Sequence, residues 1–272
     1  MQSLYFSPTG NVRSITEAIT RGTKLHKLKP VNLTMQKKRE SWSGKLDGDI
    51  LLIGVPTHAG SYPSLLLPYL KKLEGKGRWA VPVAVSGNAQ MRTCLPDLAG
   101  VLKQQGFQIL AAANFVGKHS FSTEEIPLGV GRPDGRDLKM ARKFGRDIVE
   151  KMRLGPDDIS IVRGGNLYLR TYQASPVDAQ GSTFPATLRS AFKVAELDRS
   201  KCTGCLSCVK SCPTNAIDRE SLLISDEACI RCFACTGACE LGLRGKVVNP
   251  DAGLRAWFLH QGSVRAEPQI IL

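Results

Sequence analysis

The chain has 272 residues, of which 42% are apolar and 22% charged, the mix of an ordinary globular protein. At ~100–200 residues per domain, this length predicts one large domain or two smaller ones. No window holds the ~18 uncharged apolar residues of a membrane span, and the N-terminus has no secretory signal. We therefore expect a cytoplasmic protein with reduced thiols and no integral membrane segment.

Charge and cysteine are unevenly distributed along the chain. Residues 1–155 carry 24 basic and 12 acidic side chains, a net charge of +12, whereas residues 156–272 are close to neutral at +1. Of the nine cysteines, Cys94 stands alone and the other eight lie between Cys202 and Cys239. So many thiols in a reducing compartment indicate a metal or redox role for the C-terminal part.

The N-terminal part alternates short apolar runs with helical patterns. Strands are expected at Leu4–Phe6, Val31–Thr34, Asp49–Val55, Trp79–Val85 and Ile109–Val116. Helices are expected around Val12–Ile19, Leu65–Leu73, Leu95–Gln105 and Leu138–Met152, with Lys37–Glu40 as a solvated loop. Uninterrupted apolar strands that alternate with helices predict an α/β domain over residues 1–154, with a doubly wound, parallel, five-stranded sheet. Such sheets bind ligands beyond the carboxyl ends of their strands.

Three further segments complete the predicted organisation. Residues 155–191 show no sustained periodicity and are expected to be a connector. Residues 192–248 hold the cysteine array in a small α+β domain, and residues 249–272 form a tail. Within the tail, Leu254–Leu259 is expected to be a short helix and Gln269–Leu272 an extended end.

The cysteines repeat one spacing twice. Cys202, Cys205, Cys208 and Cys212 follow C-x₂-C-x₂-C-x₃-C, with Pro213 next, and Cys229, Cys232, Cys235 and Cys239 repeat the pattern. This is the bacterial ferredoxin run, in which the fourth cysteine ligates the other cluster. The spacing predicts one [4Fe–4S] cluster on Cys202, Cys205, Cys208 and Cys239, and a second on Cys229, Cys232, Cys235 and Cys212.

Two other interpretations of the array are less favoured. Structural zinc uses well-separated cysteine pairs, and a disulfide framework suits a secreted chain. One departure is that Glu240 follows Cys239 where the run has Pro, which leaves the local geometry of the second half open. The segment as a whole resembles ferredoxins with two four-iron clusters, which implies storage of single electrons at low potential.

The turn after the first strand, from Ser7 to Val12, has the composition of an anion site. The Ser7 and Thr9 hydroxyls can donate to a phosphate, Gly10 allows close backbone approach, and Asn11 can cap the next helix. An ordinary capped turn explains this local chemistry equally well. The turn also resembles the flavodoxin loop around the FMN phosphate, with Val12 where Thr is usual, so that one hydroxyl contact would be lost.

The resemblance to flavodoxins extends to two later loops. After the third strand come Thr57, His58, Ala59 and Gly60, which the resemblance places along the isoalloxazine ring. There, His58 or Tyr62 would stack on the ring or lie on the surface. After the fourth strand come Ser86, Gly87 and Asn88, whose backbone would face the flavin. The aromatic residue usual a few positions later is missing, and Met91 and Arg92 stand there.

A flavodoxin-like half followed by a ferredoxin half resembles the flavodoxin–ferredoxin fusion proteins. The resemblance implies an electron-transfer iron–sulfur flavoprotein that passes low-potential electrons between FMN and two [4Fe–4S] clusters. No catalytic acid, base or nucleophile stands out, so we expect an oxidoreductase or an electron-transfer component of one. Two alternatives stay open: a flavin-dependent reductase of a small molecule, and a ferredoxin whose flavin-free first half docks a partner.

A basic region and the lone cysteine complete the analysis. The basic region consists of Lys24, Lys27, Lys29, Lys37, Lys38 and Arg39. We interpret it first as solvated surface and second as a steering surface for an acidic redox partner protein. No nucleic-acid-binding motif accompanies this charge, so no nucleic acid is expected. Cys94 is expected to be a small buried residue rather than a ligand.

Overall fold

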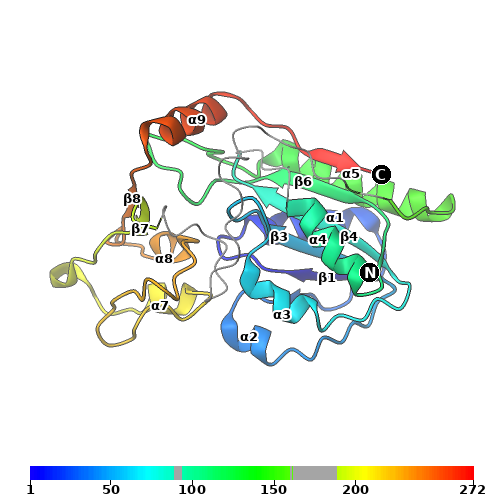
Figure 1. The fold of residues 1–272 in the computed structure, drawn as a ribbon, viewed down its shortest axis with the longest axis horizontal. Helices are drawn as coiled ribbons and strands as arrows, with labels where there is room; N and C mark the ends of the chain where they lie inside the picture. Colours follow the sequence, from blue (N-terminus) through cyan, green and yellow to red (C-terminus); the bar gives the residue numbers. More distant parts are fainter. Residues whose placement is uncertain (89–93, 160, 162–188) are drawn as a thin grey trace.

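The computed structural model describes residues 1–88, 94–159, 161 and 189–272. One lobe is built on a mostly parallel sheet, and a smaller lobe carries the cysteine array (Figure 1). The sheet runs in the order β2-β1-β3-β4-β6, and this is the flavodoxin-like strand order. Its strands are β1 (Gln2–Tyr5), β2 (Val31–Asn32), β3 (Ile50–Pro56), β4 (Trp79–Ser86) and β6 (Ala112–Val116).

The sheet contains more strands than the five expected. The run expected at Ile109–Val116 is divided into β5 (Gln108–Ile109) and β6, both of which pair with β4 in parallel. The tail adds β9 (Gln269–Ile271), which pairs antiparallel with β6 and makes the sheet seven-stranded. The expected parallel core is therefore present, and its outer edge is closed by the C-terminus of the chain.

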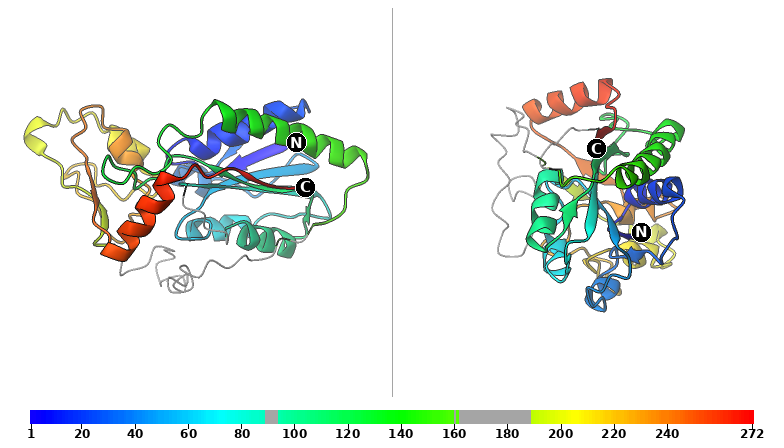
Figure 2. Two further views of the ribbon diagram at one scale, coloured as in Figure 1. Left: turned by 90° about the horizontal axis from the view of Figure 1, so that it is seen from above. Right: turned by 90° about the vertical axis from the view of Figure 1, so that its right-hand side faces the viewer.

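Helices cover both faces of the sheet, as expected (Figure 2). One face carries α1 (Asn11–Thr23) and α5 (Gly135–Arg153), which bury Ile15, Ile19 and Phe144 in a common core. The other carries α3 (Leu67–Leu70) and α4 (Cys94–Gln104). The α1–α5 contact requires glycine, because a Cβ on Gly145 would lie 2.2 Å from the Ile19 carbonyl oxygen. Cys94 is buried in the α4 core, as expected.

The second lobe consists of short elements. β7 (Phe192–Val194) and β8 (Lys246–Val248) form a two-stranded antiparallel sheet. The cysteine runs contain α7 (Ser207–Ser211) and α8 (Ala234–Gly237). From this lobe, α9 (Ala252–Ser263) leads the chain back to β9 in the sheet (Figure 2).

Several sequence expectations need correction or lie outside these residues. Lys37–Glu40 is part of helix α2 (Gln36–Glu40) rather than a solvated loop, and its Arg39 is buried. The helix expected at Leu65–Leu73 is a 3₁₀ turn, Ser64–Leu66, followed by the short α3. Most of the expected connector lies outside the described residues. None of the helices that are described is long and apolar enough to cross a membrane.

Candidate functional site

The two cysteine runs have the same backbone geometry. Left-handed φ angles of 69° and 58° occur at Gly204 and Leu206, and angles of 56° and 57° at the equivalent Arg231 and Phe233. Short helices begin directly after both turns, at Ser207 and Ala234. These turns fold each run back on itself, which lets closely spaced thiols face one centre. Equivalent positive angles also follow the fourth cysteines, 52° at Asn215 and 65° at Gly242, so Glu240 does not interrupt the backbone repeat.

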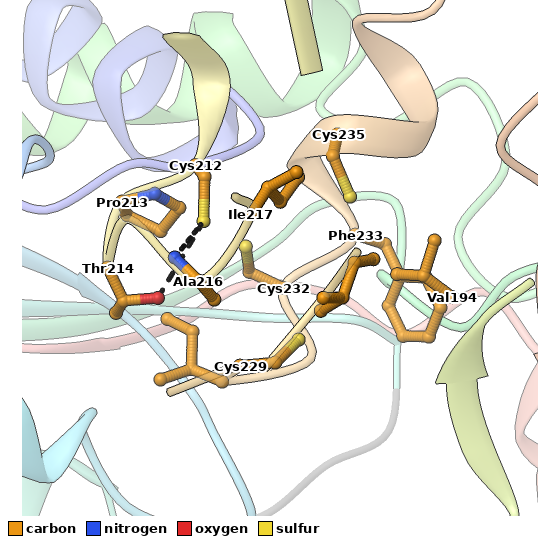
Figure 3. Close-up of a pocket in the computed structure, with 12 residues that line it drawn as sticks. Val194, Cys212, Pro213, Thr214, Ala216, Ile217, Cys229, Cys232, Phe233 and Cys235 are labelled. Carbon is orange, nitrogen blue, oxygen red and sulfur yellow. Dashed lines mark hydrogen bonds between the residues drawn. The ribbon is translucent and has the colours of Figure 1, made fainter. Parts of the chain in front are cut away.

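Four cysteines from both runs line one cavity (Figure 3). They are Cys212, Cys229, Cys232 and Cys235, accompanied by the apolar side chains of Val194, Ile217, Ile224 and Phe233. The Cys212 sulfur accepts a hydrogen bond from the Ala216 backbone N–H, at an N···S distance of 3.2 Å. The structure thus brings Cys212 of the first run to the three cysteines that begin the second.

Burial makes the three thiols of the second run in this cavity poor acids in the absence of a compensating charge. It raises the pKa of Cys235 to about 12, and it also raises the pKa of Cys229 and Cys232. The nearby guanidiniums of Arg231 and Arg244 act in the opposite direction on Cys229 and Cys235. Because thiolate is the form that binds metal, this cavity suits a cationic cluster core that offsets the buried negative charge.

The other predicted cluster ligands lie closer to solvent. Cys205 is exposed, and Cys202, Cys208 and Cys239 are partly buried. The Cys205 sulfur lies 3.4 Å from the Ser207 hydroxyl oxygen, and this hydrogen bond lowers the pKa of Cys205. Among the described residues, no three His, Cys, Asp or Glu side chains are arranged around a single metal ion. The membership of Cys239 in this set stays a prediction.

The first loop predicted to bind flavin, residues 7–12, leaves the start of α1 open. Gly10, not Asn11, occupies the N-cap position, with φ 88° and no side-chain cap, and a Cβ there would meet nothing within 4 Å. Asn11 instead donates its amide to the Lys118 carbonyl at 3.0 Å. The Ser7 hydroxyl accepts from the Arg13 N–H at 3.0 Å. Thr9 is exposed, and Val12 is buried beneath the helix, so only the backbone of Val12 faces this opening.

The second loop predicted to bind flavin, residues 57–60, lies against the cysteine lobe. The backbone turns tightly at Ala59 and Gly60, directly after Thr57. Two hydrogen bonds between the backbones of His58 and Ser61 close this turn. Burial lowers the pKa of His58 to about 4, and its ring lies beside the Ile230 backbone and the Arg231 charge. Tyr62 packs in the core on the α3–α4 face of the sheet. His58 thus lies next to the run that starts at Cys229, whereas Tyr62 is a core residue.

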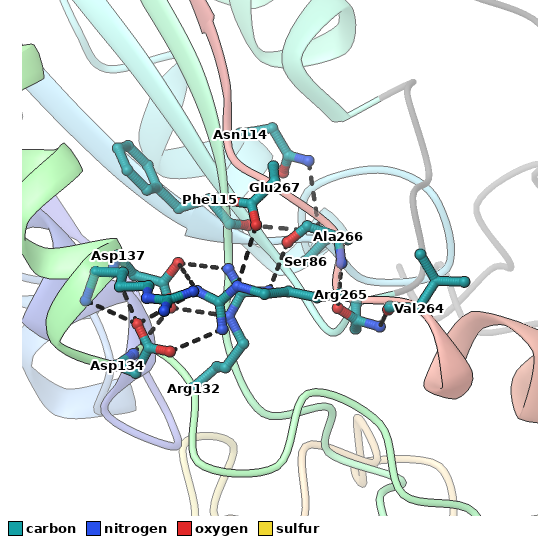
Figure 4. Close-up of polar contacts among 12 residues, drawn as sticks. Ser86, Asn114, Phe115, Arg132, Asp134, Asp137, Val264, Arg265, Ala266 and Glu267 are labelled. Atoms are coloured by element: carbon teal, nitrogen blue, oxygen red, sulfur yellow. Dashed lines mark hydrogen bonds and ion pairs between the residues drawn. The ribbon is translucent and has the colours of Figure 1, made fainter.

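The third loop predicted to bind flavin, residues 86–88, is bound by the C-terminal tail. The Asn88 amide donates to the carbonyls of Gln261 and Val264 at 2.6 and 2.8 Å, and its oxygen accepts from the Ala266 N–H at 3.1 Å. Gly87 is required because a Cβ there would lie 2.2 Å from the His119 ring. Ser86 contacts the Phe115 carbonyl beside the tail (Figure 4). The Asn88 side chain is therefore structural, and Met91 and Arg92 lie outside the described residues.

Sequence reasoning missed two groups of residues that connect the lobes. Phe121, from the loop after β6, stacks on Phe192 with ring centroids 4.2 Å apart and meets Phe233 edge-on at 5.5 Å. Arg39 is the second link, because its Nη2 donates to the Pro213 carbonyl at 2.7 Å, next to Cys212. A sequence signal existed for the first link, since Phe233 lies between two cluster cysteines.

Comparisons with known proteins bear on the two lobes separately. A family model for a 4Fe-4S dicluster domain matches residues 195–240. The structure is similar to a flavodoxin from the domain Archaea, with 16% identity, a TM-score of 0.42, and coverage of 56% of this chain and 99% of that one. Flavodoxin from Fusobacterium nucleatum bound to flavin mononucleotide gives 12% identity, a TM-score of 0.40, and coverage of 57% and 98%. The rubredoxin oxygen:oxidoreductase of Desulfovibrio gigas gives 12% identity, a TM-score of 0.42, and coverage of 56% of this chain and 36% of that one. No curated protein matches the chain.

The strand order of the sheet and the matched family model identify the two halves. The first half has a flavodoxin-like α/β fold, and the second contains a 4Fe–4S dicluster domain. The expected order of a flavodoxin-like half followed by a ferredoxin half is thereby confirmed.

Proposed function

We propose that the chain is an electron-transfer iron–sulfur flavoprotein, which passes low-potential electrons between FMN and two [4Fe–4S] clusters. The observation that carries this proposal is the cavity at which Cys212 meets Cys229, Cys232 and Cys235. When bound, the clusters supply one-electron chemistry, and FMN supplies one- or two-electron chemistry. No substrate acid or base is needed for this function.

At the cavity, the protein supplies ligands, hydrogen bonds and protection from water. The Ala216 N–H donates a hydrogen bond to the Cys212 sulfur, which is one of the proposed ligand atoms. The side chains of Val194, Ile217 and Ile224 cover the cavity with apolar surface. We propose the same ligand role for Cys202, Cys205, Cys208 and Cys239 around the second cluster, nearer to the surface.

For FMN, the proposed phosphate site is the uncapped start of α1. The open space at Gly10 and the helix N-terminus suit an anion, and the Thr9 hydroxyl is exposed beside them. We propose that Thr57, His58, Ala59 and Gly60, with the backbone of Ser86, Gly87 and Asn88, hold the ring. This arrangement places the ring loop beside the run that starts at Cys229, because His58 lies against Ile230.

We propose an acidic redox protein as the external partner. Cys205 is exposed, so the cluster near it is accessible to another protein. The basic side chains of Lys24, Lys27, Lys29, Lys37 and Lys38 are also exposed and would attract an acidic surface. Arg39 does not belong to this surface, because it is buried.

Quantitation of iron, sulfide and flavin on anaerobically purified protein tests the proposal. We expect two [4Fe–4S] clusters and one FMN per chain. Clusters without flavin would support a ferredoxin with a docking domain, whereas zinc or disulfides would contradict the proposal. If the chain instead reduces a small molecule in steady turnover, and Thr9→Ala abolishes this activity, the protein is a flavin-dependent reductase.

A further inference from the structure

Two buried arginines contact residues that line the cavity of Cys212, Cys229, Cys232 and Cys235, and a third acts electrostatically on Cys235. Arg39 is 4% exposed, Arg231 1% and Arg244 3%. Arg39 reaches the cavity wall from helix α2 of the other lobe, through its bond to the Pro213 carbonyl. Arg231 lies between two of the ligands and donates to the Cys229 carbonyl at 2.6 Å. Arg244 donates to the Leu222 carbonyl at 2.7 Å and acts electrostatically on Cys235.

The charges of these arginines are incompletely balanced by the protein. The fourth buried arginine of the described residues, Arg132, forms an ion pair with the equally buried Asp137. By contrast, the carboxylate paired with Arg231 belongs to Asp226, whose side chain is 70% exposed. Arg39 and Arg244 bind backbone carbonyls. A buried guanidinium without a buried anion is costly, so a negatively charged group in the cavity would stabilise this arrangement.

One donor of each arginine also lacks an acceptor. Within the described part of the chain, the Nε–H groups of Arg39, Arg231 and Arg244 are buried and make no hydrogen bond. Buried donors are nearly always satisfied in folded proteins. Arg39 and Arg231 also contact residues that line the cavity, so an anionic group bound there, such as a four-iron cluster with its sulfides and thiolates, would offset their buried charge.

The surroundings of the other predicted cluster site differ. Hydrogen bonds with the Ser207 and Thr203 side chains and with the backbone, rather than a nearby cation, lower the pKa of Cys205. Lys201, the neighbour of Cys202, is exposed and pairs with Asp198 at 3.3 Å. Charges in water are strongly screened, whereas buried charges act through a low dielectric. The two sites therefore differ both in solvent exposure and in the buried positive charge near them.

We propose that Arg39, Arg231 and Arg244 raise the reduction potential of the cluster at Cys212, Cys229, Cys232 and Cys235 above that of the cluster at Cys202, Cys205 and Cys208. Reduction adds one negative charge to a cluster, and nearby cations stabilise that added charge. Burial alone would disfavour reduction, and the three cations reverse this effect. Once a redox partner protein has supplied one electron to the chain and has itself been oxidised by one electron, that electron would reside at the buried site rather than at the exposed one. This inference rests on the proposed function.

A redox titration of the full chain, followed by electron paramagnetic resonance, tests the proposal. In the unaltered protein we expect two one-electron steps. In Arg39→Met, reduction at the higher-potential step becomes about tenfold less favourable, so its midpoint potential falls by about 59 mV. The midpoint potential of the lower step stays unchanged. Arg39→Lys keeps the charge and restores most of the shift. The matched control is Lys38→Met, which removes an exposed charge from the same helix and moves neither step.

The possible outcomes separate this inference from the function on which it rests. Preparations without four-iron clusters would overturn both. Two clusters whose higher step is unchanged in Arg39→Met, or whose lower step moves instead, would overturn the inference alone. If Arg39→Met loses iron, Arg244→Met removes a charge from a different segment, and the same downward shift of the higher step is required of it.

Discussion

At the scale of single residues, Cys212 carries the main structural argument. It belongs by sequence to the first run, yet it lines the cavity of Cys229, Cys232 and Cys235. The spacing predicts that it ligates the second cluster, and the fold brings it to the other three predicted ligands of that cluster. If the two runs exchange their fourth ligands as proposed, the effects of substitutions in different runs on iron content are not independent.

Double substitutions test this assignment through the iron content. Because Cys212 and Cys232 would serve the same cluster, Cys212→Ala, Cys232→Ala and the double variant should each retain roughly half of the iron, a non-additive result. By contrast, Cys205→Ala combined with Cys232→Ala should lose nearly all of it. Cys94→Ala removes a buried thiol outside the array and serves as the control with full iron. Near-complete loss in the Cys212–Cys232 double variant would contradict the assignment.

At the scale of elements, the C-terminal tail is held by the start of α5. The Arg132 guanidinium donates to the Asp137 carboxylate, at 2.8 Å from Nε, and to the Ala266 carbonyl (Figure 4). Asp134 caps the same helix, and Arg265 pairs with it at 2.8 Å and keeps the pKa of this carboxyl below its usual range. One network thus fixes a helix start and the segment that leads to β9.

Substitution of Arg132 should be far more destabilising than that of its exposed neighbour. Arg132→Ala leaves the buried Asp137 carboxylate with only the more distant Arg265 guanidinium, at 3.6 Å, so we expect a loss of about 3 kcal/mol in the free energy of unfolding. Arg136→Ala, at an exposed position in the first turn of α5, should change it by about 0.5 kcal/mol or less. Denaturant unfolding of both variants measures the difference. Equal effects would show that the buried ion pair is not what stabilises this junction.

At the scale of the whole molecule, a neutral histidine lies where the lobes meet. The His119 Nδ1 accepts a hydrogen bond from the Phe121 N–H at 3.0 Å, and its ring meets Phe258 of α9 edge-on at 5.7 Å. Burial and the nearby Lys246 charge lower the pKa of His119 to about 4. Protonation would break the bond to Phe121, so the junction requires the neutral ring.

Stability should therefore fall as the pH drops from about 6.5 toward 4. In this range the unfolded chain binds a proton at His119 that the folded chain does not, which favours unfolding. Between pH 7 and pH 5 we expect a loss of about 2 kcal/mol from this group. Anaerobic unfolding at both pH values measures it, with His119→Gln expected to reduce the loss and the exposed His260→Gln to leave it unchanged. A pH dependence that is the same in His119→Gln would contradict this account.

How far the sequence predicts the molecule depends on the range of the interactions. The alternation of apolar strands and helical patterns predicts the parallel sheet and its two helical layers, because each pattern depends on residues within one element. Cysteine spacing predicts the ligand sets, because the reach of a short loop is local. The expectation of a solvated loop at Lys37–Glu40 was wrong for the opposite reason, since Arg39 finds its partner 174 residues away at Pro213.

The sequence by itself determined the flavodoxin-like and ferredoxin halves, their order and the cysteine repeat. Only the tertiary structure decided which arginines are buried around one cluster cavity and that Asn88 binds the tail through Ala266, 178 residues away. The same holds for β9, which closes the sheet beside β6. These features join side chains and backbone from distant segments, and no periodicity or local spacing records such a contact. Burial and partner choice are properties of the folded chain.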